Sequence, residues 1–272
     1  MKTNRKIALL LATAVALCSF AGAAYANRLD DIMKAGKLSV CTSPNFAPYE
    51  FLDSTRSGQD RFRGADMMLI RYVADKLGVE LEINALDFSS VIAAVTNGKH
   101  DLGISGMSYT PVRAQSMELS DPYKKGDEEG IIVRKEDVDK FKSFDDFKGA
   151  TVGANSGTLQ EQLASTQIPG AVIHRFDTVA NAVLAVSAGK IDAAACAVPN
   201  GEMFMTTNPN LQVLPLRFHQ DKSGYVIAGF KGETELIGKV SEIIHEVLEK
   251  GLYDNWLKEA QAEVEQLGLN KK

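Results

Sequence analysis

The sequence predicts an α/β protein with two lobes, each built around a mostly parallel sheet flanked by helices. Short apolar strands alternate with amphipathic helices along the chain, an order that is typical of parallel sheets. One helix–strand unit occurs twice in similar form. The chain has 272 residues, and the 246 that remain without the first 26 suit two lobes of about 100–120 residues each.

Each predicted element rests on a local pattern. Alternating or continuous apolar runs indicate strands, and apolar residues three or four apart indicate helices. Gly78 and Gly251 stand where helices end, and Thr110 and Thr158 stand where helices begin. Strands are predicted at residues 38–41, 79–83, 102–105, 131–133, 150–154 and 193–196, and helices at 67–77, 91–95, 182–186 and 236–248.

Residues 1–26 are predicted to be a signal peptide rather than part of the fold. Three basic residues open the chain, and the apolar run at 7–20 is too short to span a bilayer comfortably. Residues 24–26, Ala-Tyr-Ala, have the small-x-small pattern of a cleavage site. We therefore expect export to the periplasm, with the mature chain beginning at Asn27.

Charge and cysteine content exclude several classes of partner. The predicted signal peptide holds three of the 30 basic residues and no acid, so residues 27–272 carry 27 Lys and Arg against 35 Asp and Glu, a formal charge of −8. Such acidity argues against nucleic acid as a partner. No CxxC, HExxH or Cys/His cluster occurs, so no metal or other cofactor is expected. Cys41 and Cys196 are expected to be small buried residues; a disulfide between them is the alternative in an exported protein.

A weak internal repeat indicates that the two lobes share a topology. A helix, a glycine, a lysine and an apolar strand follow one another at residues 91–105 and again at 182–196. Gly98 and Gly189 lie 91 residues apart. Ligands of such sheets bind beyond the carboxyl ends of the strands. The ends of the repeated strands, Ser105-Gly106 and Cys196-Ala197, are therefore expected to line a shared cleft.

Arg113 is the candidate anion-binding residue. It falls in the first turn of a helix that Thr110 caps and Pro111 opens, near the positive end of the helix dipole, where a cation is disfavoured. A guanidinium at this position is explained if an anion is held between it and nearby free N–H groups. The alternative is a solvated surface arginine.

Several short motifs follow one another in a characteristic order. They are SPNFAPYEF (43–51), FRGAD (62–66), DF (87–88), SGMSYTPVR (105–113), SDPY (120–123), SGT (156–158) and GKID (189–192). In order and spacing they resemble those of the periplasmic substrate-binding proteins of polar amino-acid ABC transporters, the family 3 solute-binding proteins. The resemblance covers nearly all of residues 27–272.

The resemblance implies a type II periplasmic-binding fold, with two lobes that are joined by two crossing hinge strands and close over a ligand. Lobe 1 is expected to hold residues 27–124 and 224–272, and lobe 2 residues 125–223. The implied function is capture of an amino acid or related small carboxylate in the interlobe cleft and its delivery to an ABC permease of the inner membrane. The protein would be a monomer and not an enzyme.

The resemblance also implies a set of ligand-binding residues. Arg113 and the backbone N–H of Ser108 would hold the ligand carboxylate from lobe 1, and the backbone N–H groups of Thr158 and Leu159 would hold it from lobe 2. The Gly106 carbonyl and the Ser108 hydroxyl would accept hydrogen bonds from a ligand ammonium. The remaining positions are Ser105 at the strand end, Phe46 and Phe88 on either side of the ligand, Asn155 near its side chain, and Ala197.

Ala197 departs from the family pattern. Relatives carry an acid here that pairs with the ligand ammonium, and burying an ammonium without a counter-charge is costly. Ser43 stands where relatives that prefer basic ligands carry an acid, so lysine and arginine are disfavoured as ligands. Three explanations stay open: Glu50 or Glu202 reaches the ammonium, the ligand lacks an ammonium, or the protein has a changed role.

Two other functions remain as alternatives. An enzyme resembling cyclohexadienyl dehydratases would need an acid in the cleft near residues 197–200, where this chain reads AVPN, with Glu202 as the nearest candidate. A ligand sensor would have to signal through a partner, because no membrane-spanning run follows the predicted signal peptide.

Overall fold

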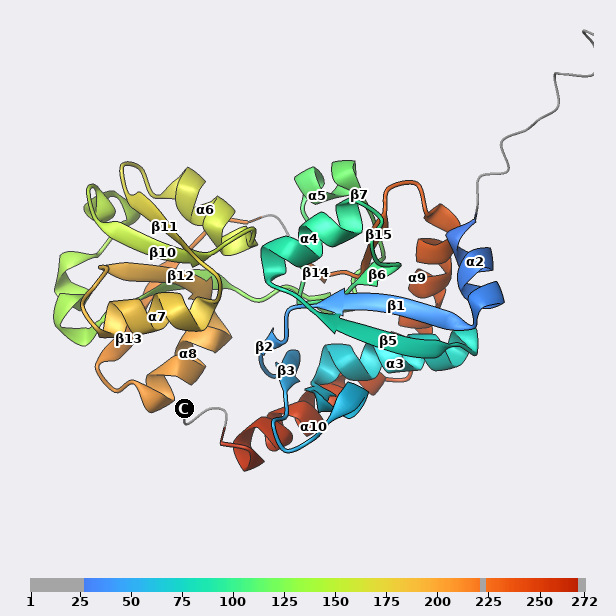
Figure 1. Cartoon of the computed structure of the whole chain (residues 1–272). Coiled ribbons are helices and arrows are strands. Elements are labelled where there is room, and N and C mark those ends of the chain that lie inside the picture. Colours follow the sequence, from blue (N-terminus) through green and yellow to red (C-terminus); the bar gives the residue numbers. More distant parts are fainter. Residues whose placement is uncertain (1–26, 221–223, 269–272) are drawn as a thin grey trace, which may run out of the picture.

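The computed structural model describes residues 27–220 and 224–268, which form two lobes lying side by side (Figure 1). The predicted α/β class and the two-lobed arrangement are confirmed. The predicted signal peptide, residues 1–26, lies outside the described residues.

Lobe 1 is built on a sheet with the strand order β5-β1-β6-β15-β7. Buried residues of α3, α9 and α10 form one core on this sheet, and those of α4 form a second core around Cys41. The strands are β1 (Lys37–Thr42), β5 (Glu80–Ala85), β6 (Leu102–Gly103), β7 (Met117–Leu119) and β15 (Ala228–Phe230). The helices are α2 (Arg28–Ala35), α3 (Ala65–Leu77), α4 (Phe88–Thr96), α5 (Pro111–Ser116), α9 (Thr234–Glu249) and α10 (Leu252–Gln266). A small antiparallel sheet adds β2 (Asn45–Phe46), β3 (Glu50–Leu52) and β4 (Phe62–Arg63).

Lobe 2 is built on a sheet with the strand order β11-β10-β12-β9-β13. Buried residues of α6 form one core on this sheet, and α7 and α8 pack in another around Cys196. The strands are β9 (Glu129–Arg134), β10 (Thr151–Asn155), β11 (Val172–Phe176), β12 (Ala193–Ala197) and β13 (Leu211–Arg217). The helices are α6 (Leu159–Gln167), α7 (Val179–Ser187) and α8 (Val198–Thr207).

Each sheet is mostly parallel, as predicted, and each contains one reversed strand. In lobe 1, β15 runs antiparallel to β6 and β7, and in lobe 2, β9 runs antiparallel to β12 and β13. Each of these strands follows a crossing between the lobes. The crossings carry β8 (Lys124–Lys125) and β14 (Gly224–Tyr225), which pair antiparallel. These are the two expected hinge strands; the boundary after residue 124 stays a prediction, and residue 223 lies outside the described residues.

The helix ends follow the residues that the sequence analysis singled out. Gly78 has a positive φ of 69° at the end of α3, a conformation that suits glycine. The Thr110 hydroxyl accepts a hydrogen bond from the Arg113 N–H at 3.1 Å, which caps α5. The Thr158 hydroxyl does the same for α6 by accepting from the Glu161 N–H at 3.3 Å.

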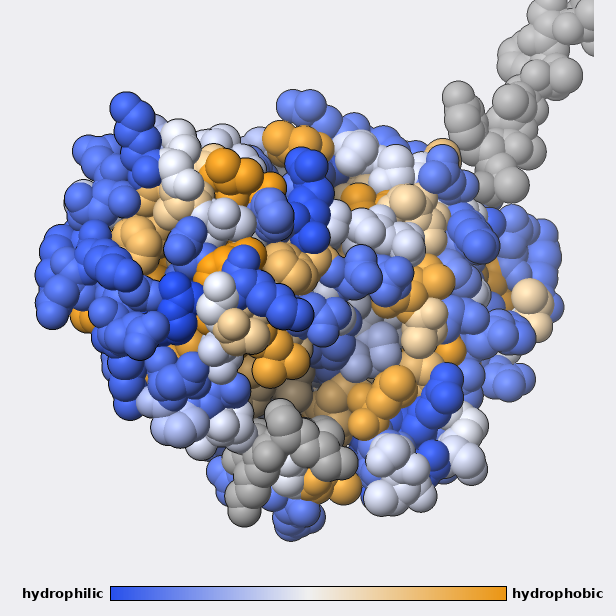
Figure 2. Space-filling view, turned by 60° about the vertical axis from the view of Figure 1, so that its left-hand side comes forward, coloured by the Kyte–Doolittle hydropathy of each residue, from blue (hydrophilic) through white to orange (hydrophobic). Residues whose placement is uncertain are grey.

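Cys41 and Cys196 are both free and buried, and they lie in the cores of different lobes. They are the small buried residues expected, and the alternative of a disulfide is not realised. Figure 2 shows a mainly hydrophilic outer surface, with smaller hydrophobic patches toward the middle of the view. Within residues 27–220 and 224–268, no helix is both long and apolar enough to cross a membrane.

Candidate functional site

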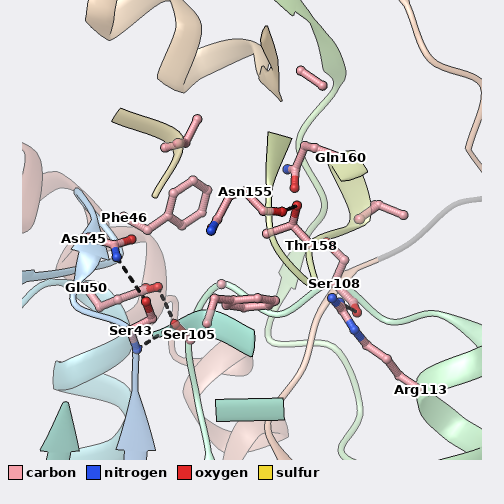
Figure 3. A pocket seen from close by; sticks show the side chains of 15 residues that line it. Ser43, Asn45, Phe46, Glu50, Ser105, Ser108, Arg113, Asn155, Thr158 and Gln160 are labelled. Atoms are coloured by element: carbon pink, nitrogen blue, oxygen red, sulfur yellow. Dashed lines mark hydrogen bonds between the residues drawn. The ribbon is translucent and has the colours of Figure 1, made fainter. Parts of the chain in front are cut away.

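A cavity lies between the lobes, at the carboxyl ends of β1, β6 and β10 and beside β12 (Figure 3). It contains about 530 Å³ of space between atoms, part of it open to solvent. Lobe 1 contributes Ser43, Asn45, Phe46, Glu50, Phe88, Ser105, Gly106, Ser108 and Arg113. Lobe 2 contributes Asn155, Thr158, Leu159, Gln160, Val179 and Ala195.

Arg113 enters this cavity from α5 and is buried, with 8% of its surface exposed. One guanidinium nitrogen donates to the Ser108 carbonyl at 2.6 Å and the other to the Gly157 carbonyl at 2.9 Å. The guanidinium also lies 5.4 Å from the centre of the Phe88 ring. Burial lowers the pKa of Arg113 to about 10, and no carboxylate among the described residues opposes this shift. A buried cation that is held by carbonyls alone is costly, so it is ready to pair with an anion.

The bond between Arg113 and Gly157 joins the two lobes across the cavity, since Gly157 directly precedes α6. Gly157 has a positive φ of 78°, and a Cβ built on it would lie 3.4 Å from the Ser89 Cα of lobe 1. A second interlobe bond runs from the Asn200 amide to the Ala47 carbonyl at 3.5 Å. The structure therefore shows the lobes in contact, in a closed arrangement.

Glu50 lies in the lobe 1 wall, where it is buried beside the Asp66 carboxyl. Its Oε1 accepts a hydrogen bond from the Ser105 hydroxyl at 2.9 Å, and that hydroxyl accepts from the Ser43 N–H at 3.0 Å. Burial and the neighbouring Asp66 carboxyl raise the pKa of Glu50 well above its usual range. Burial and the neighbouring carboxyl thus disfavour the charged form of Glu50, which fixes the loop at Ser105 more than it offers charge to a ligand.

Gly106 allows the close approach of loop and aromatic ring in this wall. Its φ is 49°, and a Cβ built on it would lie 2.7 Å from the Phe46 ring. Its N–H donates to the Asp66 carboxylate at 2.9 Å, which also accepts from Tyr123 and Tyr253. Glycine at 106 thus lets the Phe46 ring lie directly against the backbone that faces the ligand.

The lobe 2 wall is formed by the start of α6 and the end of β10. The Asn155 amide donates to the carbonyls of Phe176 and Asp177, and the Thr158 hydroxyl donates to the Asn155 carbonyl at 2.6 Å. The side-chain donors of Asn155 and Thr158 are thus engaged with backbone. The first N–H groups of α6, which begins at Leu159, remain as helix N-terminal donors beside the cavity.

Nine of the ten predicted site residues line this cavity, and Ala197 does not. Ala195, two residues earlier on the same strand, is the lining residue instead. Ala197 is 2% exposed, caps α8, and is paired with Glu129 of β9. Cys196 faces the other side of the sheet. The expectation that β12 reaches the cleft with its last two residues is corrected: β12 runs straight into α8, which covers its end.

Four cavity residues were not considered as site residues from the sequence: Asn45, Gln160, Val179 and Ala195. Ser43 was considered only as a position that sets ligand preference, and Glu50 only as one alternative partner of a ligand ammonium. Ser43 and Glu50 flank the predicted Phe46 in sequence. Gln160 is the second residue of α6, and its position follows once the N-terminus of that helix is known to face the cleft. Glu202, the other acid considered for an ammonium, is exposed and does not line the cavity.

The chain matches the model of the bacterial extracellular solute-binding proteins, family 3, over residues 38–260. The chain belongs to this family. It is 30% identical to the arginine-binding extracellular protein ArtP of Bacillus subtilis, over 79% of this chain and 82% of the relative. It is 28% identical to a probable histidine-binding protein of Campylobacter jejuni, over 83% of this chain and 85% of the relative.

Solved structures agree with the sequence relatives. The substrate-binding protein AbpA of an amino-acid ABC transporter from Streptococcus pneumoniae, solved with L-arginine, is 31% identical with a TM-score of 0.78 and covers 85% of this chain and 97% of its own. The ancestral amino-acid-binding protein AncCDT-1, a precursor of cyclohexadienyl dehydratase, is 30% identical with a TM-score of 0.75 and covers 86% and 99%. This protein is therefore a solute-binding protein of family 3 with the type II periplasmic-binding fold, as the resemblance implied.

Among the described residues, no group of three or more His, Cys, Asp or Glu side chains is arranged to hold a metal ion. The side chains at the cavity are instead aromatic, amide, hydroxyl and guanidinium groups, together with Glu50. They can hold a carboxylate, enclose an apolar body and accept or donate neutral hydrogen bonds.

Proposed function

We propose that this family-3 protein binds an α-amino acid between its lobes and delivers it to an ABC permease from the extracytoplasmic space. The observation that carries the proposal is Arg113, a buried guanidinium at the cavity that no described carboxylate neutralises. A ligand carboxylate would replace the carbonyl contacts of Arg113 with a charge-assisted pair. The amino-acid ligands named for the relatives support the same class of ligand.

The remaining lining residues support a ligand of amino-acid size. The Phe46 and Phe88 rings both line the cavity and provide apolar surface for the body of the ligand. Asn45 and Asn155 provide amides nearby. Because Glu50 is the only carboxyl among the described lining residues and its burial beside Asp66 disfavours the charged form, we expect a polar uncharged side chain to be preferred over that of lysine or arginine.

Closure of the lobes supports the transport role. The bond from Arg113 to Gly157 brings the proposed carboxylate-binding residue of lobe 1 against the loop that precedes α6 in lobe 2. A carboxylate that contacts both sides would favour the closed form over an open one, and a permease could recognise that form. We further propose that the protein acts as a monomer, without catalysis, after removal of residues 1–26.

A thermal-shift screen tests the ligand class. The full-length chain is expressed, purified, then unfolded and refolded to remove co-purified ligand, and it is screened against L- and D-amino acids, opines, dipeptides and small carboxylates. A ligand at 100 times its dissociation constant stabilises a protein by about 2.7 kcal/mol, which is readily measured. We expect the largest shift with an uncharged polar L-amino acid.

Other outcomes of the screen would contradict the proposal. Shifts with non-amino carboxylates alone would mean a different ligand class, and no shift with any compound would exclude amino-acid capture. Stimulation of ATP hydrolysis by the cognate permease separates transport from sensing, because a sensor partner gives no such signal. Turnover of prephenate or arogenate by the purified protein would favour the enzyme alternative.

A further inference from the structure

A buried acid lies directly opposite the residue at which the family acid is missing. In the antiparallel pair of β9 and β12, Glu129 is the register partner of Ala197. Residues paired in this way point to the same face of a sheet, with Cβ atoms about 4.5–5.5 Å apart. Glu129 is 1% exposed. The acid that the family resemblance implies at residue 197 of β12 is absent, and a carboxyl stands on the neighbouring strand instead.

The side-chain lengths of Glu129 and Ala197 fit a carboxyl on β9 in place of one on β12. Glutamate is one methylene longer than aspartate, so from the adjacent strand it can reach the region that an aspartate at 197 would occupy. Alanine at 197 contributes only a methyl group and leaves room for the Glu129 side chain. A second acid at 197 would place two carboxyls opposite each other, which is unfavourable.

Glu129 is connected to the cavity through Gln160. The Gln160 Nε2 donates to the Glu129 Oε2 at 2.8 Å, and Gln160 itself lines the cavity from the start of α6. Because the amide nitrogen is turned to Glu129, the amide oxygen of Gln160, bonded to the same carbon, points in a different direction in the amide plane and can act as an acceptor. In Figure 3, Gln160 and Arg113 face the cavity from different lobes. The carboxylate and the ammonium of an α-amino acid, which are bonded to the same carbon, would then be contacted from different lobes.

The other acids near the cleft have different partners. Glu50 bonds to Ser105 in the lobe 1 wall, beside Asp66. Glu161 accepts from the Gly157 N–H and from Arg175. Neither is placed against Gln160.

We propose that Glu129 and Gln160 form the subsite for the ammonium group of the ligand. The Gln160 amide oxygen accepts a hydrogen bond from the ammonium, and Glu129 is the positioning residue that orients this amide and supplies negative charge behind it. This inference rests on the proposed function, because it requires a ligand with an ammonium group.

The subsite has a consequence for pH dependence. Burial raises the pKa of the Glu129 carboxyl to about 8, the Gln160 hydrogen bond and Lys124 lower it, and Asp127 raises it. The other titratable groups that interact with Glu129 are the buried Cys196 and Tyr225. An ammonium favours the ionised carboxylate, so ligand binding below pH 8 should release a proton. Affinity should then rise with pH, by up to tenfold per unit between pH 6 and pH 8.

Titration calorimetry on the refolded full-length chain tests the subsite. The probes are the standard L-amino acid with the largest thermal shift and the carboxylic acid that lacks only its α-ammonium. We expect Glu129→Gln to weaken amino-acid binding at least tenfold at pH 8, to abolish its dependence on pH between 6 and 8, and to leave binding of the deaminated acid unchanged. Glu128→Gln is the matched control, because this neighbouring carboxylate is 75% exposed and pairs with Arg217; it should change neither quantity more than twofold.

Two further variants keep the test decisive. In the Glu129→Gln background, Ala197→Asp should restore preference for the amino acid over its deaminated form; if it does not, the two positions do not serve one subsite. Gln160→Leu should lower the same preference, and it replaces Glu129→Gln if that variant does not fold. Unchanged affinity and pH profile in Glu129→Gln would overturn this inference alone, whereas failure of the wild-type chain to bind any amino acid would overturn the proposed function and this inference with it.

Discussion

Replacement of Arg113 by methionine should separate ligand binding from stability. Methionine keeps an unbranched apolar stem that packs against Phe88 but removes the charge. If Arg113 pairs with a ligand carboxylate, its loss should remove a charge-assisted hydrogen-bond pair that contributes about 2–4 kcal/mol to binding. The dissociation constant should then rise roughly 30- to 900-fold.

The unliganded protein should respond differently, because the stabilising and destabilising contributions of Arg113 nearly cancel. Burial lowers its pKa from 12.5 to about 10, and at about 1.4 kcal/mol per unit this corresponds to a desolvation cost of roughly 3 kcal/mol. Two hydrogen bonds to carbonyls, at about 1 kcal/mol each, and a cation–π contact of about 1 kcal/mol offset that cost. We therefore expect Arg113→Met to change the free energy of unfolding by no more than about 1 kcal/mol without ligand.

Titration calorimetry with the amino acid found in the screen measures the first quantity, and urea denaturation of refolded protein measures the second. Arg61→Met is the control, because Arg61 is exposed and does not line the cavity; it should leave affinity unchanged. Retained affinity in Arg113→Met would refute the assignment of Arg113 to the ligand. A loss of more than about 2 kcal/mol in the unliganded protein would show instead that Arg113 mainly stabilises the fold.

Three further predictions concern the walls of the cavity. Gly106→Ala should cost about 1–2 kcal/mol of stability from its positive φ and more from the clash with Phe46. Gly149→Ala, also at positive φ but with open space around its Cβ, should show the backbone cost alone. Urea denaturation compares the two variants, and equal losses of stability would contradict the close packing of Gly106 against Phe46. The pKa of Glu129 is raised to about 8 from an ordinary 4.5, so the folded protein retains a proton that the unfolded chain releases. The free energy of unfolding should therefore fall as pH rises from about 4.5 to 8, by up to about 1.4 kcal/mol per pH unit from this group. Glu129→Gln should remove this part of the pH dependence, as measured by denaturation at pH 5 and pH 8. A pH dependence identical to that of the wild type would count against a buried, protonated carboxyl. Thr158→Ala should cost about 1 kcal/mol through loss of the α6 cap, measured in the same assay, and no loss would mean that water replaces the hydroxyl.

Local chemistry was sufficient to predict much of the fold and part of the site. Apolar periodicity indicated the strands and helices, and a glycine or a threonine marked individual helix ends, because a cap depends on only a few neighbouring residues. Arg113 stood out for the same reason: its place after Thr110 and Pro111 set a cation at the wrong end of a helix. The order of short motifs then pointed to a family, which the family match over residues 38–260 confirmed.

Only the tertiary structure decided which side chains meet in the cleft. Ala197 was expected there from its place on the strand, but the direct passage of β12 into α8 covers it. The raised pKa of Glu50 depends on burial and on Asp66, and the link from Glu129 through Gln160 depends on the register of β9 with β12 and on the docking of α6. Register, burial and contact between distant segments arise from packing of the whole chain, so no local pattern in the sequence could specify them.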